Sequence, residues 1–147
     1  MILGFGKSAI HVPRAVYDEI INHARDAYPD ECCGFLVGKA IRDKRVWQVE
    51  RGTNANTERS RDRYVIDPKE YHLTDKVART QGLDILGFYH SHPDHPDRPS
   101  EFDRAEGHPG FSYIIVSVQG GKTVSARSWI FDKDDEPFRE EKIKIVD

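Results

Sequence analysis

Residues 90–103 read His90-Ser91-His92-Pro93-Asp94-His95-Pro96-Asp97-Arg98-Pro99-Ser100-Glu101-Phe102-Asp103, and the rest of the chain is organised around them. They continue the apolar run Ile85-Leu86-Gly87-Phe88-Tyr89, which predicts a buried strand from residue 84 to residue 92. Residues i and i+2 of a strand point to the same side of the sheet. His90 and His92 can therefore offer two imidazoles to one point in space.

Asp103 is predicted to supply a third ligand to the same point. The prolines at positions 93, 96 and 99 fix their backbone φ angles, which makes the connection stiff. Ser100 is typical of a helix N-cap, so Asp103 falls in the first turn of a short helix over 101–106. Two neutral imidazoles and one carboxylate suit Zn²⁺, and three protein ligands leave a fourth tetrahedral position for water, as in catalytic zinc sites. The sequence predicts one zinc ion per chain.

The pattern His90-x-His92-x7-Ser100-x2-Asp103, with Glu31 upstream in Glu31-Cys32-Cys33-Gly34-Phe35-Leu36-Val37-Gly38, resembles the complete signature of the JAMM, or MPN+, zinc metalloproteases. The resemblance covers nearly the whole chain. It implies that His90, His92 and Asp103 hold zinc, that Glu31 is the general acid/base, and that Ser100 helps to stabilise the tetrahedral intermediate. It also implies an MPN fold of mixed α/β class, a curved mixed β-sheet sandwiched between helices and similar to that of cytidine deaminases.

This set of residues supports hydrolysis. Zinc lowers the pKa of bound water from about 15.7 to about 7 and can polarise a scissile carbonyl. A carboxylate such as Glu31, within hydrogen-bond reach of that water, can take its proton and return it to the leaving amine. The Ser100 hydroxyl can donate to the developing oxyanion, because an N-cap uses the hydroxyl oxygen as acceptor and leaves its hydrogen free.

The resemblance also implies the substrate class. Stand-alone prokaryotic members act on ubiquitin-fold partners, either sulfur carriers or small modifiers, and cut after a C-terminal Gly-Gly tail. The Gly120-Gly121 connection is too short for the second insertion of eukaryotic deubiquitinating members, whereas the polar loop from Thr53 to Arg63 is a short counterpart of the first. We therefore expect a sulfur carrier or small modifier rather than ubiquitin. The surface of this chain on which the substrate docks is expected to include Arg59, Arg61 and Arg63 of that loop, unless the loop is merely solvated.

Composition and charge limit the number of domains and the kinds of partner that the chain can have. A chain of 147 residues is expected to form one domain, residues 1–147, with 37% hydrophobic and 32% charged residues, as in soluble globular proteins. A net charge of −3 gives no basic field for nucleic acid. No signal peptide is recognisable at the N-terminus, and no segment approaches 18 apolar residues, so we expect a cytoplasmic protein without a membrane partner.

Two alternatives compete with this interpretation. A nucleobase deaminase would need His-x-Glu and Pro-Cys-x-x-Cys, and neither is present. A non-catalytic MPN scaffold that binds proteins is expected to have lost metal ligands, whereas this chain keeps them all.

The adjacent Cys32 and Cys33 cannot form an ordinary disulfide with each other. They are either small core residues or a redox-sensitive pair beside Glu31.

The remaining elements follow from periodicity and capping signals. Helices are predicted over 14–28 and from Asp67 to about Thr80, the second with Pro68 in its first turn and Glu70 completing a capping box. Strands are predicted at 8–12, 31–39, 46–50, 64–66, 112–118 and 123–131, with a final edge strand within 137–146. Four further histidines are not assigned to the metal: His23, His72, His95 and His108.

Overall fold

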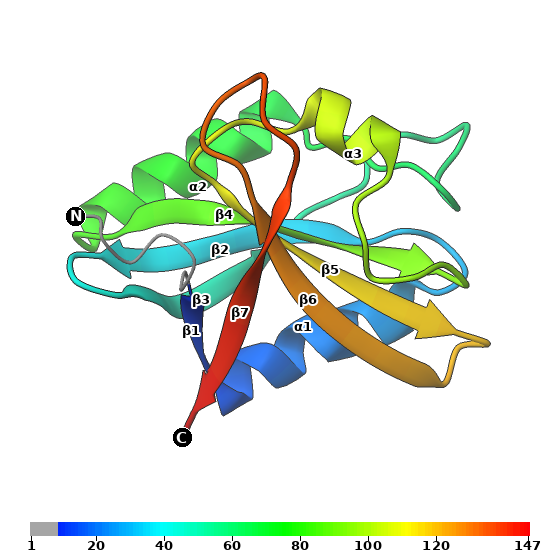
Figure 1. The fold of residues 1–147 in the computed structure, drawn as a ribbon, viewed down its shortest axis with the longest axis horizontal. Coiled ribbons are helices and arrows are strands. Elements are labelled where there is room, and N and C mark those ends of the chain that lie inside the picture. The colour runs from blue at the N-terminus through cyan, green and yellow to red at the C-terminus, as the bar shows by residue number, and fades with distance from the viewer. Residues whose placement is uncertain (1–8) are drawn as a thin grey trace.

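The computed structural model describes residues 9–147 (Figure 1). Over that range the chain runs through β1 (Ala9–Pro13), α1 (Arg14–Ala27), β2 (Cys33–Ala40), β3 (Lys44–Arg51), α2 (Pro68–Thr80), β4 (Asp84–Pro93), α3 (Glu101–Glu106), β5 (Ser112–Gln119), β6 (Thr123–Ile130) and β7 (Arg139–Val146). This is the mixed α/β architecture that the sequence predicts. None of the helices within residues 9–147 is both long and apolar enough to cross a membrane.

The seven strands form one curved sheet in the order β1-β3-β2-β4-β5-β6-β7, which closes into a barrel. β1 pairs in parallel with both β3 and β7, and β4 pairs in parallel with β5, while the other neighbours are antiparallel. The prediction of a final edge strand is therefore wrong. β7 pairs with β6 on one side and, through registers such as Ile10↔Ile143, with β1 on the other.

A buried polar cluster holds β7 against three other strands of the barrel. Glu141 is 1% exposed, and its carboxylate accepts hydrogen bonds from Lys44 Nζ, Ser112 Oγ and Ser128 Oγ, each at 2.8 Å. These partners come from β3, β5 and β6. Because a buried charge is tolerated only when it is paired and hydrogen-bonded, the cluster fixes how β7 seats against three other strands.

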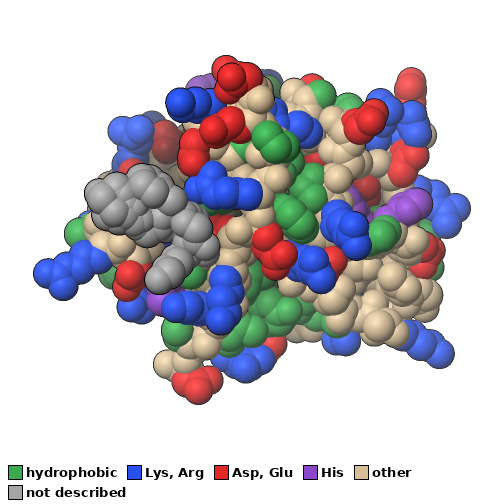
Figure 2. All heavy atoms as spheres, in the orientation of Figure 1, with side chains coloured by type: hydrophobic (Ala, Val, Ile, Leu, Met, Phe, Trp, Pro, Cys, Tyr) green, Lys and Arg blue, Asp and Glu red, His purple; other side chains and the backbone are tan. Residues whose placement is uncertain are grey.

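Helices α1 and α2 lie on opposite sides of the central strands (Figure 1). The α1 side is filled by an aliphatic cluster that includes Ile20, Leu36 and Ile114, and the α2 side by an aromatic cluster that includes Phe35 and Phe88. Every residue of β4 from Ile85 to Pro93 is buried, which explains its nearly continuous apolar sequence. On the surface, basic and acidic side chains are interspersed over the face seen in Figure 2.

Two local predictions differ from the structure around residues 64–70. The strand predicted over 64–66 is wrong, because this stretch makes only an isolated bridge, Asn54↔Ile66. Asp67 caps α2 as predicted by accepting from Lys69 N at 2.9 Å. Glu70 instead accepts from Thr53 N at 3.0 Å, so it satisfies a donor of the preceding loop rather than completing a capping box.

Candidate metal centre

Three buried side chains converge at the end of β4. His90 Nε2 lies 3.2 Å from His92 Nε2 and 3.3 Å from Asp103 Oδ1, and His92 Nε2 lies 3.0 Å from Asp103 Oδ2. Within residues 9–147 this is the only group of three or more His, Cys, Asp or Glu residues whose ligand atoms all lie within 4.8 Å of one another. Two imidazoles and a carboxylate at this separation fit a divalent metal ion of borderline hardness.

Backbone structure on both sides of the centre sets these positions. The parallel registers His90↔Ile115 and His92↔Ser117 hold β4 along β5, so both imidazoles leave the same face of the sheet. On α3, Ser100 Oγ accepts from Asp103 N at 3.0 Å, and Asp103 Oδ2 accepts from Ser100 N at 2.9 Å. This reciprocal capping box confirms the predicted N-cap and orients the Asp103 carboxylate.

The two imidazoles are supported in different ways. His92 Nδ1 donates to the backbone oxygen of Pro96 at 2.8 Å, which leaves Nε2 free to bind a metal. His90 Nδ1 has no hydrogen-bond partner among residues 9–147. The His90 ring instead stacks on Tyr64, with 4.3 Å between ring centroids and 22° between planes.

Electrostatics favours a carboxylate at Asp103 and a neutral imidazole at His90. Burial opposes ionisation of Asp103, but the two imidazoles and the Ser100 N–H outweigh burial and hold its pKa well below the ordinary value. Burial lowers the pKa of His90. The pKa of His92 is raised, because its contacts with Asp103 outweigh its burial. Metal binding requires both imidazoles to be neutral at the ligating nitrogen and the carboxylate to be ionised, so a bound metal ion would displace protons from this group.

Glu31 lies two residues before β2, the neighbour of the strand that carries both histidines. The pair Cys33↔His90 joins β2 to β4, and Ser91 N donates to Cys32 O at 3.2 Å, so the chain just after Glu31 runs beside the histidine strand. The Glu31 side chain is buried, being 6% exposed. This burial raises the pKa of Glu31 to about 8, with the charge of His92 opposing the shift and that of Asp103 adding to it.

Ser100 completes the predicted set of five residues. It is exposed and occupies the N-cap of α3, where its hydroxyl oxygen accepts from Asp103 N. The hydrogen of that hydroxyl is not used in the capping bond and can donate to another group. Ser100 therefore lies directly beside Asp103, one of the candidate ligands.

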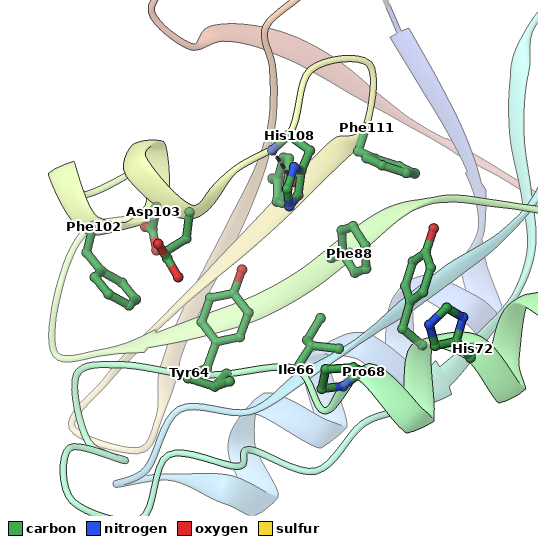
Figure 3. A pocket seen from close by; sticks show the side chains of 13 residues that line it. Tyr64, Ile66, Pro68, His72, Phe88, Phe102, Asp103, His108 and Phe111 are labelled. Atoms are coloured by element: carbon green, nitrogen blue, oxygen red, sulfur yellow. Dashed lines mark hydrogen bonds between the residues drawn. The ribbon is translucent and has the colours of Figure 1, made fainter. Parts of the chain in front are cut away.

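A cavity of about 480 Å³ adjoins the centre on the side of α2 and α3 (Figure 3). Tyr64, Phe102 and Asp103 lie at one end, and Phe88, Phe111 and His72 line the other. His72 and His108 border this cavity and lie outside the His90–His92–Asp103 group. Neither Tyr64 nor Phe102 is predicted as a site residue from the sequence. The pattern around residue 64 indicates only a short strand, and Phe102 falls within the predicted short helix over 101–106.

The two cysteines are buried and free. Burial raises the pKa of Cys32 to about 11 and that of Cys33 to about 12. The thiolate is the reactive form of cysteine, and it is scarce at neutral pH in both residues. These observations favour small core residues over a redox-sensitive pair.

Fold and site together define a mixed α/β protein whose buried His-His-Asp group is able to bind a metal. A model of the prokaryotic homologs of the JAB domain matches residues 13–132, and the chain belongs to this JAB/MPN family. The match confirms the resemblance found in the sequence.

Curated relatives are similar over most of their length. The desampylase of Haloferax volcanii is 33% identical over 133 residues, which covers 87% of this chain and 90% of the relative. A probable TtuB-protein conjugate cleaving protease of Thermus thermophilus is 28% identical over 80% of this chain and 76% of the relative. The CysO-cysteine peptidase of Mycobacterium tuberculosis is 28% identical over 88% of both chains. These relatives are named as peptidases or desampylases.

Solved structures support the fold independently. The solution structure of a protein from Desulfitobacterium hafniense is 33% identical and superposes with a TM-score of 0.83 over 94% of this chain and 93% of that chain. A JAB1/MPN domain protein from Archaeoglobus fulgidus is 21% identical, with a TM-score of 0.57 over 95% of this chain and 99% of that chain. The second likeness shows the MPN fold alone.

Proposed function

We propose that this protein is a zinc-dependent metallopeptidase or isopeptidase that hydrolyses the bond after the C-terminal Gly-Gly of a ubiquitin-fold protein. The substrate is a sulfur-carrier protein or a small ubiquitin-like modifier. The observation that carries the proposal is the convergence of His90, His92 and Asp103 in a buried group whose ligand atoms lie within 4.8 Å. Three protein ligands leave a position open, whereas structural zinc sites normally use four.

Zinc held by these three residues supplies a Lewis acid that acidifies water and polarises a carbonyl. The chain supplies the rest of the chemistry. The Glu31 carboxylate accepts a proton from the attacking water and delivers it to the leaving nitrogen. The Ser100 hydroxyl donates a hydrogen bond to the carbonyl oxygen as negative charge develops there.

The environment of Glu31 suits this proton transfer. A general base works best when its pKa lies near the working pH, and burial already raises the pKa of Glu31 to about 8. A divalent cation on the neighbouring ligands would favour the ionised form and bring this value down towards neutrality. Glu31 would then take up and release a proton with little cost in either direction.

The named relatives support the substrate class. They include a desampylase, a protease that cleaves TtuB-protein conjugates and a peptidase that acts on CysO-cysteine. Two of these names state cleavage of a conjugate or of a protein joined to cysteine, which supports a substrate of the proposed kind. The assignment of the Gly-Gly tail rests on the resemblance to the JAMM family.

The loop from Thr53 to Arg63 is our candidate for part of the substrate-docking surface. Its backbone is tied to the catalytic side of the molecule, because Ser60 O accepts from Glu31 N at 2.6 Å and Asn54 Nδ2 donates to Glu31 O at 3.2 Å. Arg59 is held by Asp62 through a hydrogen bond of 3.1 Å from Nε to Oδ1. Arg59 and Arg61 are exposed on a loop that is hydrogen-bonded to the backbone of Glu31, which supports a docking role over a merely solvated loop.

A metal titration coupled to a hydrolysis assay tests this function. The protein is stripped with a chelator, reloaded with measured amounts of Zn²⁺, and incubated with a ubiquitin-fold protein that carries an extension after its Gly-Gly. Cleavage should rise in proportion to zinc and level off at one ion per chain. A protein that binds the substrate but cleaves nothing at any zinc level would instead be a non-catalytic scaffold.

A further inference from the structure

We infer that Arg63 and Tyr64 form a clasp that positions the metal ligand His90, with Tyr64 as the positioning residue. The inference rests on the proposed function in one respect, that the His90–His92–Asp103 group holds a metal ion. The two clasp residues lie in the loop between β3 and α2, and neither belongs to the ligand set.

The need for a clasp follows from the difference between the two histidines. Histidines that bind metals usually donate their second ring nitrogen to a carbonyl or carboxylate, which fixes the orientation of the ring. His92 has this support from Pro96, whereas the Nδ1 atom of the fully buried His90 has no hydrogen-bond partner among the described residues. Another contact must therefore keep the His90 ring from rotating.

Tyr64 provides that contact. Its ring lies against the His90 ring with centroids 4.3 Å apart and planes inclined by 22°, which is a stacked arrangement. A ring packed flat against an imidazole blocks rotation about the bond that carries the imidazole. The stack thus holds His90 Nε2 towards His92 and Asp103.

Arg63, the residue before Tyr64, contacts the helix that carries the third ligand. The Arg63 guanidinium lies over the ring of Phe102, 4.4 Å from its centroid, and Phe102 precedes Asp103 on α3. Asn54 Nδ2 also donates to the backbone oxygen of Arg63 at 2.9 Å. Adjacent loop residues therefore contact both elements that supply metal ligands, one through His90 and the other through the neighbour of Asp103. Figure 3 shows Tyr64, Phe102 and Asp103 at the same end of the cavity.

The test measures zinc affinity by competition with a chromophoric chelator, so it does not depend on any substrate. Tyr64→Leu should raise the Kd for Zn²⁺ about 10–100-fold, the usual effect of losing a group that orients a ligand. Tyr64→Phe keeps the ring and should bind zinc like the wild type. The matched control is Tyr71→Leu, which removes a ring from the same cavity that packs on Phe35 and Phe88 rather than on a ligand. It should leave the Kd unchanged.

Arg63→Gln provides a second, milder variant at a partly exposed position. If Tyr64→Leu does not fold, the Kd of Arg63→Gln for Zn²⁺ tests the clasp alone, and a wild-type Kd then overturns it. Arg63→Gln should weaken zinc binding less than Tyr64→Leu does while leaving the stability of the metal-free protein near that of the wild type. The clasp is overturned if both Tyr64→Leu and Arg63→Gln keep the wild-type Kd, or if Tyr71→Leu raises it as much as Tyr64→Leu. A wild-type protein that binds no zinc overturns the proposed function as well.

Discussion

Replacing Glu31 by glutamine probes the buried carboxylate beside the proposed metal ligands. In the metal-free protein, burial raises the pKa of Glu31 from its ordinary value of 4.5 to about 8. Folding therefore favours the protonated form. The stabilising contribution is fully present below pH 4.5 and is lost as the pH rises through about 8. Each pH unit within this window is worth about 1.4 kcal/mol, so wild type should lose on the order of 3 kcal/mol between pH 4.5 and 7 through this group.

Urea unfolding of chelator-treated protein at several pH values measures this effect. The glutamine side chain of the variant has no proton to lose, so the wild-type free energy of unfolding should fall relative to that of Glu31→Gln as the pH rises. The comparison largely cancels the titration of the neighbouring histidines, which both proteins share. A difference between the two proteins that stays constant from pH 5 to pH 8 would refute the burial argument.

The same variant also tests the proposed catalytic role. Glu31→Gln should bind zinc like the wild type, because Glu31 is not among the proposed ligands, while kcat falls by about 10²–10⁴-fold. Metal analysis and turnover are measured on the same preparation. Near-normal turnover in the zinc-loaded variant would remove Glu31 from the mechanism.

Three further predictions concern the other residues of the site. Alanine substitution of any proposed ligand should abolish stoichiometric zinc binding in metal analysis, and full occupancy in the triple variant would contradict the assignment of His90, His92 and Asp103. Ser100→Ala should retain zinc, lose turnover, and lose about 0.5–2 kcal/mol of stability with its N-cap, whereas wild-type turnover would leave Ser100 with a capping role alone. Charge reversal at Arg59 and Arg61 should lower kcat/KM on a folded substrate but not on a short peptide, and no change on the folded substrate would exclude this docking surface.

The proposed metal ligands could be predicted because their positions depend on local geometry. His90 and His92 are two residues apart on one strand, and Asp103 is placed by a capping box that spans only residues 100–103. The position of Glu31 depends instead on the pairing of β2 with β4, two strands that are far apart in the sequence, so the family resemblance was needed to connect it to the site.

Tertiary contacts explain what the sequence did not reveal. The sequence predicts a final edge strand within 137–146, but Glu141 is buried through partners on three other strands, and the parallel pairing of β1 with β7 closes the barrel. Likewise, Tyr64 gains its place from stacking on His90, which no local pattern around residue 64 reveals. Both features join segments that are distant in the chain, and neither leaves a periodic signal.

Cleavage of a folded substrate, analysed by intact mass, tests the proposed peptidase function most directly. A ubiquitin-fold protein carrying an extension after its Gly-Gly is incubated with zinc-loaded protein, beside a short peptide of the same junction. We expect one cut, after the second glycine, with a much higher kcat/KM on the folded protein because remote docking positions the scissile bond. Cleavage at another bond, equal kcat/KM on both substrates, or undiminished cleavage after zinc is removed would contradict the proposed function.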